Sequence, residues 1–284
     1  AAGFNNPRNP VRQRIRNNTN DNNYNAAAFG NIYVEYEPIK DLIIKTSIGG
    51  NYSGYGYKDY NYRYLGDSEP EASNSFNEGS GYNFAYTFTN TAAYKTKWRK
   101  HGVTALVGME ALNTGAGRQI SGSGINPFSM DLDFVTLSSV QSPVVNSGLY
   151  SGVNFYSLFS KLDYNFNEKY YLTGVVRRDG SSRFGPENRY GIFPAVSAAW
   201  RVTSEEFMKD LPAISDLKIR GGWGLMGNSN NVNPANQFSL YAADRGNSFY
   251  PIDGQSSGAN EGYYRSRIGN PAAKWETSET MNVG

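Results

Sequence analysis

The chain has 284 residues, a formal net charge of +2 at pH 7 and no cysteine, and 14% of its residues are aromatic. The lack of cysteine excludes disulfides, thiolate chemistry and cysteine-ligated metals, and the near-neutral charge gives no case for nucleic-acid binding. No run of roughly 18 apolar residues occurs, which excludes a transmembrane helix. The 22 tyrosines and 31 glycines favour many strands joined by tight turns.

The first 28 residues are rich in Asn and Arg and are predicted to form a loop. Alternating strands follow, mostly in pairs, because apolar and small or polar residues exchange at every second position. The predicted strands cover about residues 32–37, 42–49, 82–89, 103–110, 156–164, 170–177, 189–202, 217–223 and a ninth from 274. The chain begins at Ala1 without a leader pattern and ends in a strand pattern, so we expect an internal part of a longer chain.

The connections between these strands mostly alternate between short and long. The short turns are 37–41, 96–101, 165–169 and 203–216, and the last has one helical turn predicted after Ser204. The longer segments are 53–81, 114–152, 180–188 and 229–271. Outer-membrane barrels have short periplasmic turns and longer extracellular loops, so the pattern predicts an all-β, antiparallel transmembrane β-barrel segment.

One face of the predicted strands is apolar and the other is small or polar. Between Tyr190 and Val202 the even positions are mainly large and apolar, whereas the odd positions are small or charged except for Phe193. This alternation is typical of a wall between lipid and a wet interior. The residues predicted to face lipid are Phe84, Tyr86, Phe88, Val196 and Trp200.

Several separated motifs carry a family resemblance. They are Arg177 to Gly185 (RRDGSSRFG), the hairpin from Gly30 to Ser47, the strand from Phe193 to Arg201, Asp216 to Arg220 with Gly227-Asn228, and Asn270-Pro271 with Lys274 to Thr277. In this order they resemble the SusC/RagA family of TonB-dependent outer-membrane transporters. The family signature within the first motif is Arg177, Arg178, Asp179, Gly180, Arg183, Phe184 and Gly185.

The resemblance implies a barrel of roughly 22 strands with a plugged lumen, in the outer membrane. Residues 1–284 would then all belong to the barrel domain, with the plug and the TonB box outside them. It further implies import of an oligosaccharide or peptide, energised by TonB-ExbB-ExbD and assisted by a SusD-like lipoprotein lid, without catalysis and without a cofactor. The inward-facing Lys161, Asp163, Lys218 and Arg220 are candidates for contacts with the plug.

A run of tyrosines provides the candidate ligand surface. Aromatic rings stack on sugars, and carboxylates and amides bond hydroxyl groups. The candidate contacts are Tyr55, Tyr57, Tyr60, Tyr62, Asp59 and Asn61. The alternative is a strand that extends above the membrane and carries an aromatic girdle.

Two further groups of polar residues have weaker functional interpretations. The cluster Arg177, Arg178, Arg183 and Arg189 with Asp179 is a candidate site for an anionic ligand or a lipopolysaccharide phosphate, and its alternative is a salt-bridged network. Asp131 and Asp133 with Asn126 have Ca²⁺-ligand chemistry but a common spacing, and His101 has no evident partner. No metal site and no catalytic residue is therefore predicted.

Three other classes of protein remain as alternatives. A siderophore or cobalamin receptor would share the barrel, and a bound iron chelate would distinguish it. A secreted β-rich glycan-binding module would stay in the aqueous fraction without detergent. A glycoside hydrolase would need a carboxylate pair at strand ends, and none stands out in the sequence.

Overall fold

The computed structural model describes residues 22–63, 72–129, 131, 133–208, 214–234, 236–243, 248–251, 254, 259–260 and 262–284. In these ranges the chain is built from strands, together with four short 3-10 helices. No helix within the described ranges combines the length and the apolar character needed to cross a membrane.

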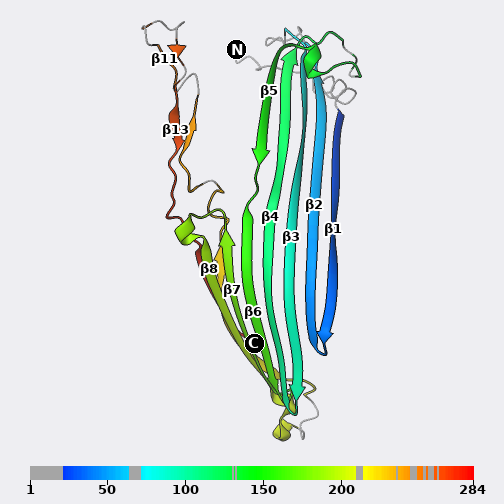
Figure 1. Ribbon diagram of the computed structural model, residues 1–284, viewed down its shortest axis with the longest axis vertical. Coiled ribbons are helices and arrows are strands. Elements are labelled where there is room, and N and C mark those ends of the chain that lie inside the picture. Colours follow the sequence, from blue (N-terminus) through cyan, green and yellow to red (C-terminus); the bar gives the residue numbers. More distant parts are fainter. Residues whose placement is uncertain are drawn as a thin grey trace, which may run out of the picture. The chain divides into compact units, whose positions relative to one another are not determined.

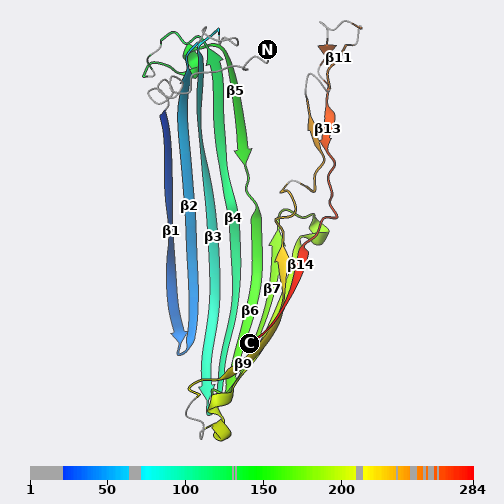
Figure 2. The same ribbon diagram turned by 180° about the vertical axis from the view of Figure 1, so that it is seen from behind.

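The main element is a sheet whose strands neighbour one another nearly in chain order (Figure 1). The order is β1-β2-β3-β4-β6-β7-β8-β9-β14, and β5 also pairs with β4. β9 and β14, both labelled in Figure 2, stand at the end of this order opposite to β1. The strands are β1 (Asn22–Ile39), β2 (Leu42–Asn61), β3 (Ser75–Trp98), β4 (His101–Ile125), β5 (Gln141–Tyr150), β6 (Asn154–Phe166), β7 (Tyr170–Ser181), β8 (Tyr190–Arg201), β9 (Lys218–Asn228) and β14 (Glu276–Val283).

Tight turns join the neighbouring strands at one end. Asn167 and Glu168, between β6 and β7, have φ values of 54° and 57°. Two successive positive φ angles are typical of the hairpin turns whose twist matches that of antiparallel strands. Between β8 and β9 the connection contains the 3-10 helices η3 (Val202–Ser204) and η4 (Glu206–Met208), in place of the single helical turn predicted after Ser204.

Two small antiparallel hairpins occur in the long segment before β14. β10 (Leu240–Ala242) pairs with β13 (Tyr264–Arg267), and β11 (Tyr250–Pro251) pairs with β12 (Ala259–Asn260). The segment 229–271, predicted as a loop, therefore contains strand structure of its own.

The strands are longer than the sequence predicted. β1 starts at Asn22, inside the stretch predicted as a loop, while residues 1–21 lie outside the described ranges. The predicted loop 53–81 contains the end of β2 and the start of β3, and the predicted loop 114–152 contains the end of β4 and all of β5. β3 and β4 have 24 and 25 residues, more than twice what a tilted strand needs to cross a bilayer.

Tyrosine–glycine pairs explain why these Gly-rich segments are strands. A Cβ atom added to Gly79 would lie 2.6 Å from the Tyr57 ring, and one added to Gly81 would lie 2.8 Å from the Tyr55 ring. The ring of Tyr24 covers Gly56 in the same way. Each ring takes the space that a side chain would fill, so glycine is required there and the ring shields the ladder. A composition that predicts a loop is thus compatible with a regular sheet.

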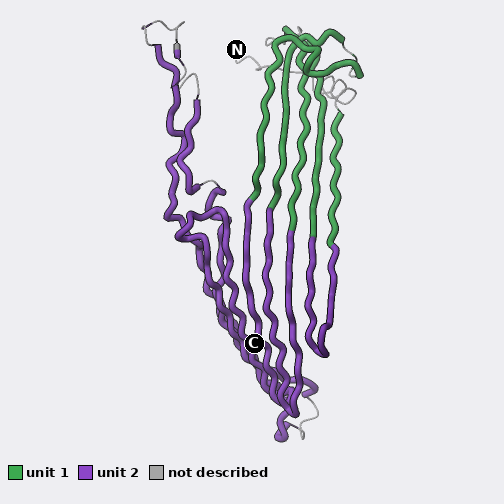
Figure 3. Tube along the Cα trace, viewed as in Figure 1, with its two compact units in different colours: residues 1–31, 49–86, 114–152 green, residues 32–48, 87–113, 153–284 purple. Residues whose placement is uncertain are grey.

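The chain divides into two compact units, and β1 to β4 contribute residues to both (Figure 3). Unit 1 comprises residues 1–31, 49–86 and 114–152, and unit 2 comprises residues 32–48, 87–113 and 153–284.

In unit 2 the register separates an apolar face from a polar face. Tyr170 lies opposite Trp200, and Gly174 opposite Val196, so these four share one face. Large exposed side chains of this apolar face are Leu158, Leu162, Leu172, Val176, Ile192 and Val196. The opposite face carries Lys161, Asp163, Thr173, Arg177, Ser197 and Arg201. A sheet with one apolar and one charged face is the arrangement of a membrane barrel wall.

Unit 1 has the same division of faces. On β3, Tyr82, Phe84 and Tyr86 share one face, since every second residue of a strand points the same way. Tyr52 stacks on Tyr82 with ring centroids 6.5 Å apart, which places Tyr52 on this apolar face. Asn83 and Gly81 occupy the opposite, polar face, and the Tyr55 ring lies against Gly81.

Unit 1 also has a small closed core. Tyr60, Phe76 and Val135 are fully buried, and Tyr62, Leu137 and Val140 pack against them. The core joins the ends of β2 and β3 to the segment between β4 and β5, which includes the 3-10 helix η1 (Leu137–Ser139). This segment is therefore fixed in place by its apolar side chains.

Candidate functional site

The polar face of unit 1 carries a group of tyrosines around one glutamine. The Tyr55 hydroxyl donates to the Gln119 Oε1 atom at 3.4 Å, and the Tyr150 hydroxyl donates to the same oxygen. Tyr57 lies beside them with its ring over Gly79. We name Tyr55, Tyr57, Gln119 and Tyr150 the tyrosine patch. Tyr55 and Tyr150 keep 38% and 44% of their surface exposed, so their rings are open to a ligand.

The other predicted ligand contacts lie in different surroundings. Tyr60 has no exposed surface and Tyr62 packs against it, with ring centroids 4.6 Å apart. Asp59 is half-buried and Asn61 is exposed. A ligand cannot reach the Tyr60 ring, so its predicted role as a contact is replaced by a role in the core of unit 1.

Gln119 and Tyr150 were not predicted from the sequence. They lie in segment 114–152, which was interpreted as a loop, and the signal that would have found them is alternation along residues 117–125. In the structure this stretch is strand and pairs with β5, so Gln119 shares its face with Tyr55.

The polar face of unit 2 carries a charged network around Arg177. Its guanidinium donates to Asp179 at 2.6 Å, to Glu110 at 3.1 Å and to the Ser157 hydroxyl at 3.0 Å. Glu110 also accepts a bond from Thr89, at 3.4 Å. The network therefore links β3, β4, β6 and β7, and Glu110 is a member that the sequence did not reveal.

On the polar face of unit 2, the charged groups of Lys161, Asp163 and Lys218 also have partners. Lys161 forms a 2.9 Å ion pair with Asp163, which also accepts a bond from Thr173. The Lys218 ammonium lies 4.5 Å from the centroid of the Tyr171 ring. Arg220 exchanges backbone hydrogen bonds with Gly284. Their predicted contact with a plug stays a prediction.

The signature arginines do not form one anion site. Arg178 lies on the apolar face, with its guanidinium 3.7 Å from the Tyr190 ring centroid. Arg177 lies on the opposite face of the sheet. Arg183 donates to the Val232 carbonyl at 2.5 Å. The Arg189 carbonyl accepts the Trp275 indole N–H at 3.1 Å. The alternative of a structural network describes this arrangement better than a cluster aimed at one ligand.

The rest of the signature closes the loop between β7 and β8. Phe184 is fully buried, and its ring centroid lies 5.1 Å from that of Trp275, which also meets Phe193 edge-on at 5.4 Å. A Cβ atom on Gly185 would lie 2.6 Å from the Pro271 carbonyl oxygen. We name Phe184, Gly185, Phe193, Pro271 and Trp275 the aromatic clasp. It joins the RRDGSSRFG and NP…KWET motifs, which are about 90 residues apart in the chain.

At the opposite end of unit 2, rings form a row across five strands. We name Trp98, His101, Phe166, Tyr170 and Trp200 the aromatic row. Their successive ring centroids are 4.9 to 6.5 Å apart. His101 also bonds the Tyr164 hydroxyl through Nδ1 at 2.8 Å. Rows of aromatic residues at one level are typical of the membrane interface.

The spacing along β8 fits the thickness of an outer membrane. Trp200 and Tyr190 lie at the two ends of the strand, on the same face. Ten residues at about 3.3 Å each, tilted by about 40°, span about 25 Å, the height of the apolar band of such barrels. Phe84, Tyr86 and Val196 are 47%, 40% and 46% exposed, while Phe88 and Trp200 are half-buried. Contact of these five with lipid stays a prediction.

One carboxylate holds the turn end of β7 and β8 together. Glu205 accepts bonds from the Tyr170 hydroxyl at 2.7 Å, the Lys169 ammonium at 2.9 Å and the Trp200 indole at 3.1 Å. These donors, Tyr170 first, lower the pKa of Glu205 to about 2. Hydrogen bonds from Arg201 and Thr203 likewise lower the pKa of Asp216 in the same turn.

The weak metal candidates are not assembled into a site. The Asp131 carboxylate accepts the Asp133 backbone N–H at 3.0 Å, and Asn126 bonds Gln141. Across the described ranges no group of three or more His, Asp or Glu side chains is placed to hold a metal ion.

The geometry can be compared with that of known proteins. The TonB-dependent receptor SusC of Bacteroides thetaiotaomicron is 27% identical over 296 aligned residues, covering 99% of the chain and 27% of the receptor. The TonB-dependent receptor P39 of Formosa agariphila is 28% identical, covering 98% and 25%. The RagAB peptide transporter structure matches with a TM-score of 0.76 at 25% identity, covering 93% of the chain and 28% of the transporter chain. No protein-family model matches.

The chain thus spans about a quarter of the length of the curated relatives it matches. Over nearly its whole length the chain is similar to TonB-dependent outer-membrane receptors of the SusC/RagA type, as the motifs indicated. This similarity and the strand-rich sheet indicate a location in the outer membrane.

Proposed function

We propose that this chain is part of the barrel wall of an importer that moves a nutrient across the outer membrane. The similarity to SusC, P39 and RagAB over nearly the whole chain carries this proposal. The two-faced sheet supports it, because an apolar face toward lipid and a charged face toward a lumen suit a transport barrel. All 284 residues would belong to this wall, and the plug and TonB box would lie elsewhere in the complete transporter.

The proposed cargo is an oligosaccharide. The tyrosine patch offers ring faces, hydroxyls and an amide on the polar face, which suits a neutral, hydroxyl-rich ligand. Tyr55 and Tyr57 would stack on the sugar and Gln119 would bond its hydroxyls, while Asp59 and Asn61 lie further along the same strand. Capture would require a SusD-like lipoprotein lid, and release would require TonB-ExbB-ExbD acting on the plug.

A peptide is the second candidate cargo. The observation that favours it is the match, with a TM-score of 0.76, to a structure described as a peptide transporter. Peptide backbones also hydrogen-bond to amides and stack against tyrosines, so the tyrosine patch is compatible with both cargos.

Uptake measurements test the proposal. A strain lacking the gene is complemented with the full-length transporter or with variants, and uptake of labelled oligosaccharides and peptides is measured with and without TonB. Import must disappear without TonB, and Tyr55→Ala combined with Gln119→Ala should lower ligand affinity about tenfold. Tyr52→Ala, on the opposite face of β2, is the matched control and should leave uptake unchanged.

Three outcomes would contradict the proposal of TonB-dependent nutrient import. TonB-independent uptake would exclude active import. Purification with a bound iron chelate and without a SusD-like lipoprotein would favour a siderophore receptor. Recovery of the full-length protein in the aqueous fraction without detergent would favour a secreted module.

A further inference from the structure

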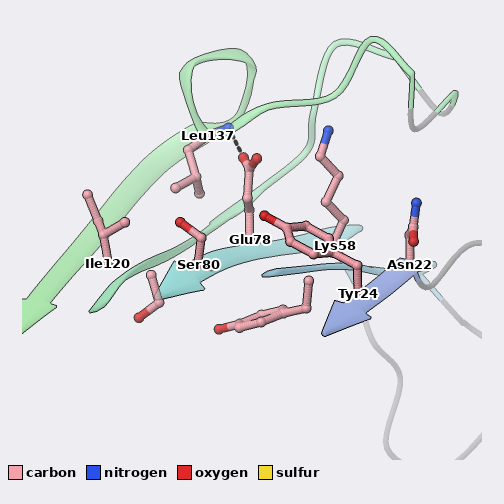
Figure 4. A pocket seen from close by; sticks show the side chains of 10 residues that line it. Asn22, Tyr24, Lys58, Glu78, Ser80, Ile120 and Leu137 are labelled. Carbon is pink, nitrogen blue, oxygen red and sulfur yellow. Dashed lines mark hydrogen bonds between the residues drawn. The ribbon is translucent and has the colours of Figure 1, made fainter. Parts of the chain in front are cut away.

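A pocket of about 320 Å³ opens in unit 1, and Tyr57 is the one member of the tyrosine patch among the residues that line it. Its volume is at the lower end of the range for ligand sites and suits one or two sugar rings. Figure 4 shows the side chains that line it. They come from four strands and from η1, and the principal ones are Asn22, Tyr24, Lys58, Glu78, Ser80 and Ile120, with Leu137 above them.

The pocket lies on the apolar face of unit 1. On β3, Glu78 and Ser80 are spaced by twos from Tyr82, Phe84 and Tyr86, so all five share one face. On β4, Ile120 shares its face with Gly122, against which Leu137 packs. Tyr55 and Gln119 point the other way.

The pocket lies toward the loop end of the strands, beyond Phe84 and Tyr86. Between four and eight residues separate Ser80 and Glu78 from these two aromatics, which is about 13–26 Å along the strand. If the aromatics mark the outer membrane interface, the pocket faces the layer directly above the lipid headgroups. In an outer membrane that layer is the saccharide of lipopolysaccharide.

Hydrogen bonds within the protein hold part of the pocket lining in place. The Lys58 ammonium donates to the Val135 carbonyl at 3.3 Å, and the Leu137 backbone N–H donates to the Glu78 carboxylate at 3.3 Å. Val135 is fully buried in the core of unit 1. Figure 4 shows the Glu78 carboxylate directed at Leu137. Because these contacts fix the segment above the strands, a ligand would not have to order it on binding.

The chemistry of the lining suits a saccharide. The Tyr24 ring covers Gly56 on one side and keeps 61% of the Tyr24 surface exposed, so it offers a flat surface for a sugar ring. Asn22 and Ser80 are exposed and supply an amide and a hydroxyl, and Ser121 lies within the lining. Lys58 has ammonium protons beyond the one used for Val135, which can meet a sugar carboxylate or phosphate.

We propose that this pocket binds the core saccharide of lipopolysaccharide and so seats the barrel against the outer leaflet. The inference rests on the outer-membrane location of the chain and is independent of what the transporter imports. Tyr24 provides the stacking surface, and Asn22, Ser80 and Lys58 provide the hydrogen bonds.

The test uses the purified full-length transporter in detergent and three probes: lipopolysaccharide that carries its core, lipid A without a core, and core oligosaccharide released from lipid A. Core-bearing lipopolysaccharide should bind more tightly than lipid A, and the released core should compete with it. Tyr24→Ala should weaken this binding about tenfold, and Ser80→Gln, which fills the pocket without touching Gly56, should weaken it similarly.

Tyr55→Ala is the control on the opposite face, and it should leave lipopolysaccharide binding unchanged while lowering uptake. Equal binding of lipid A and core-bearing lipopolysaccharide would overturn the proposal, as would unchanged binding in both pocket variants. Preferential competition by a nutrient oligosaccharide would assign the pocket to soluble glycan and would also overturn it. Since Tyr24→Ala should not alter uptake, failure here is distinguishable from failure of the import proposal.

Discussion

The two ends of the strands in unit 2 use aromatic residues in opposite ways. At the turn end, the rings of Trp98 and Tyr170 are 67% and 45% exposed on the apolar face. At the loop end, Phe184 and Phe193 are buried against Trp275. The same residue types therefore serve as surface at one end and as a core at the other.

This difference follows from what surrounds each end. A single sheet has no interior of its own, so in the proposed barrel wall lipid would stabilise its apolar face and the hydrogen-bond ladder its strands. The aromatic row has the amphipathic rings that a membrane interface favours. The aromatic clasp lies in a loop that has to exclude water by its own packing. Variants at the clasp should therefore cost more stability than variants at the row.

The largest effect is expected for Phe184→Ala in the aromatic clasp. Removing a fully buried ring should lower the free energy of unfolding by about 3–5 kcal/mol. Urea unfolding of the full-length transporter in lipid vesicles, followed by its shift in gel mobility on heating, measures this. Phe207→Ala removes a ring that is 61% exposed, in the turn end, and should cost far less. If both variants lost the same free energy of unfolding, the aromatic clasp would contribute no more to stability than an exposed ring.

The glycine of the clasp should be the next most sensitive position. Gly185→Ala places a Cβ atom 2.6 Å from the Pro271 carbonyl oxygen, so backbone has to move, at a cost of about 1–3 kcal/mol. Gly174→Ala is the matched control, because no atom lies within 4 Å of its added Cβ. The same unfolding measurement compares the two, and a cost at Gly174 as large as that at Gly185 would contradict the close approach.

Adjacent arginines on opposite faces of β7 should differ as well. Arg177→Ala leaves Glu110 and Asp179 without their shared cation and should cost about 1–2 kcal/mol, since the network is partly exposed. Arg178→Ala removes a cation–π contact with Tyr190 and should cost about 0.5–1 kcal/mol. Raising the salt concentration should reduce the difference in stability loss between the two variants, because salt screens the ion pairs of Arg177. A larger loss at Arg178 would reverse the roles assigned to the two faces.

The smallest effect is expected at Glu205 and depends on pH. Its folded pKa of about 2 lies below the ordinary value of 4.5, so the ionised carboxylate stabilises the turn above about pH 4.5 and this contribution is lost as the pH falls toward 2. Glu205→Gln should flatten that part of the stability-versus-pH curve. Identical curves for Glu205→Gln and the unaltered transporter between pH 6 and 2 would show that the carboxylate contributes nothing.

The sequence was most informative where alternation is regular. Between Tyr190 and Arg201 every second residue is apolar or small, and the observed strand has the predicted faces. The family motifs were equally direct, because the matches to SusC and RagAB confirm the resemblance. Phe193, the exception to the alternation, proved to be a buried residue of the clasp.

The sequence was least informative where glycine and tyrosine alternate. Residues 53–61 and 75–81 have a composition typical of loops, yet they are strands because each ring covers a glycine on the neighbouring strand. Such cross-strand pairing is not visible in one segment alone. The same reason hid Gln119 and Tyr150, whose partners lie on other strands.

The amino-acid sequence by itself determined the strand class, the two faces and the family resemblance, because period-two alternation and short motifs are local properties of the chain. Only the tertiary structure decided which side chains meet: Tyr60 with Val135, Arg177 with Glu110, Phe184 with Trp275. These pairs are 67 to 91 residues apart. Contacts at such separations depend on the register of several strands at once, which no local pattern specifies.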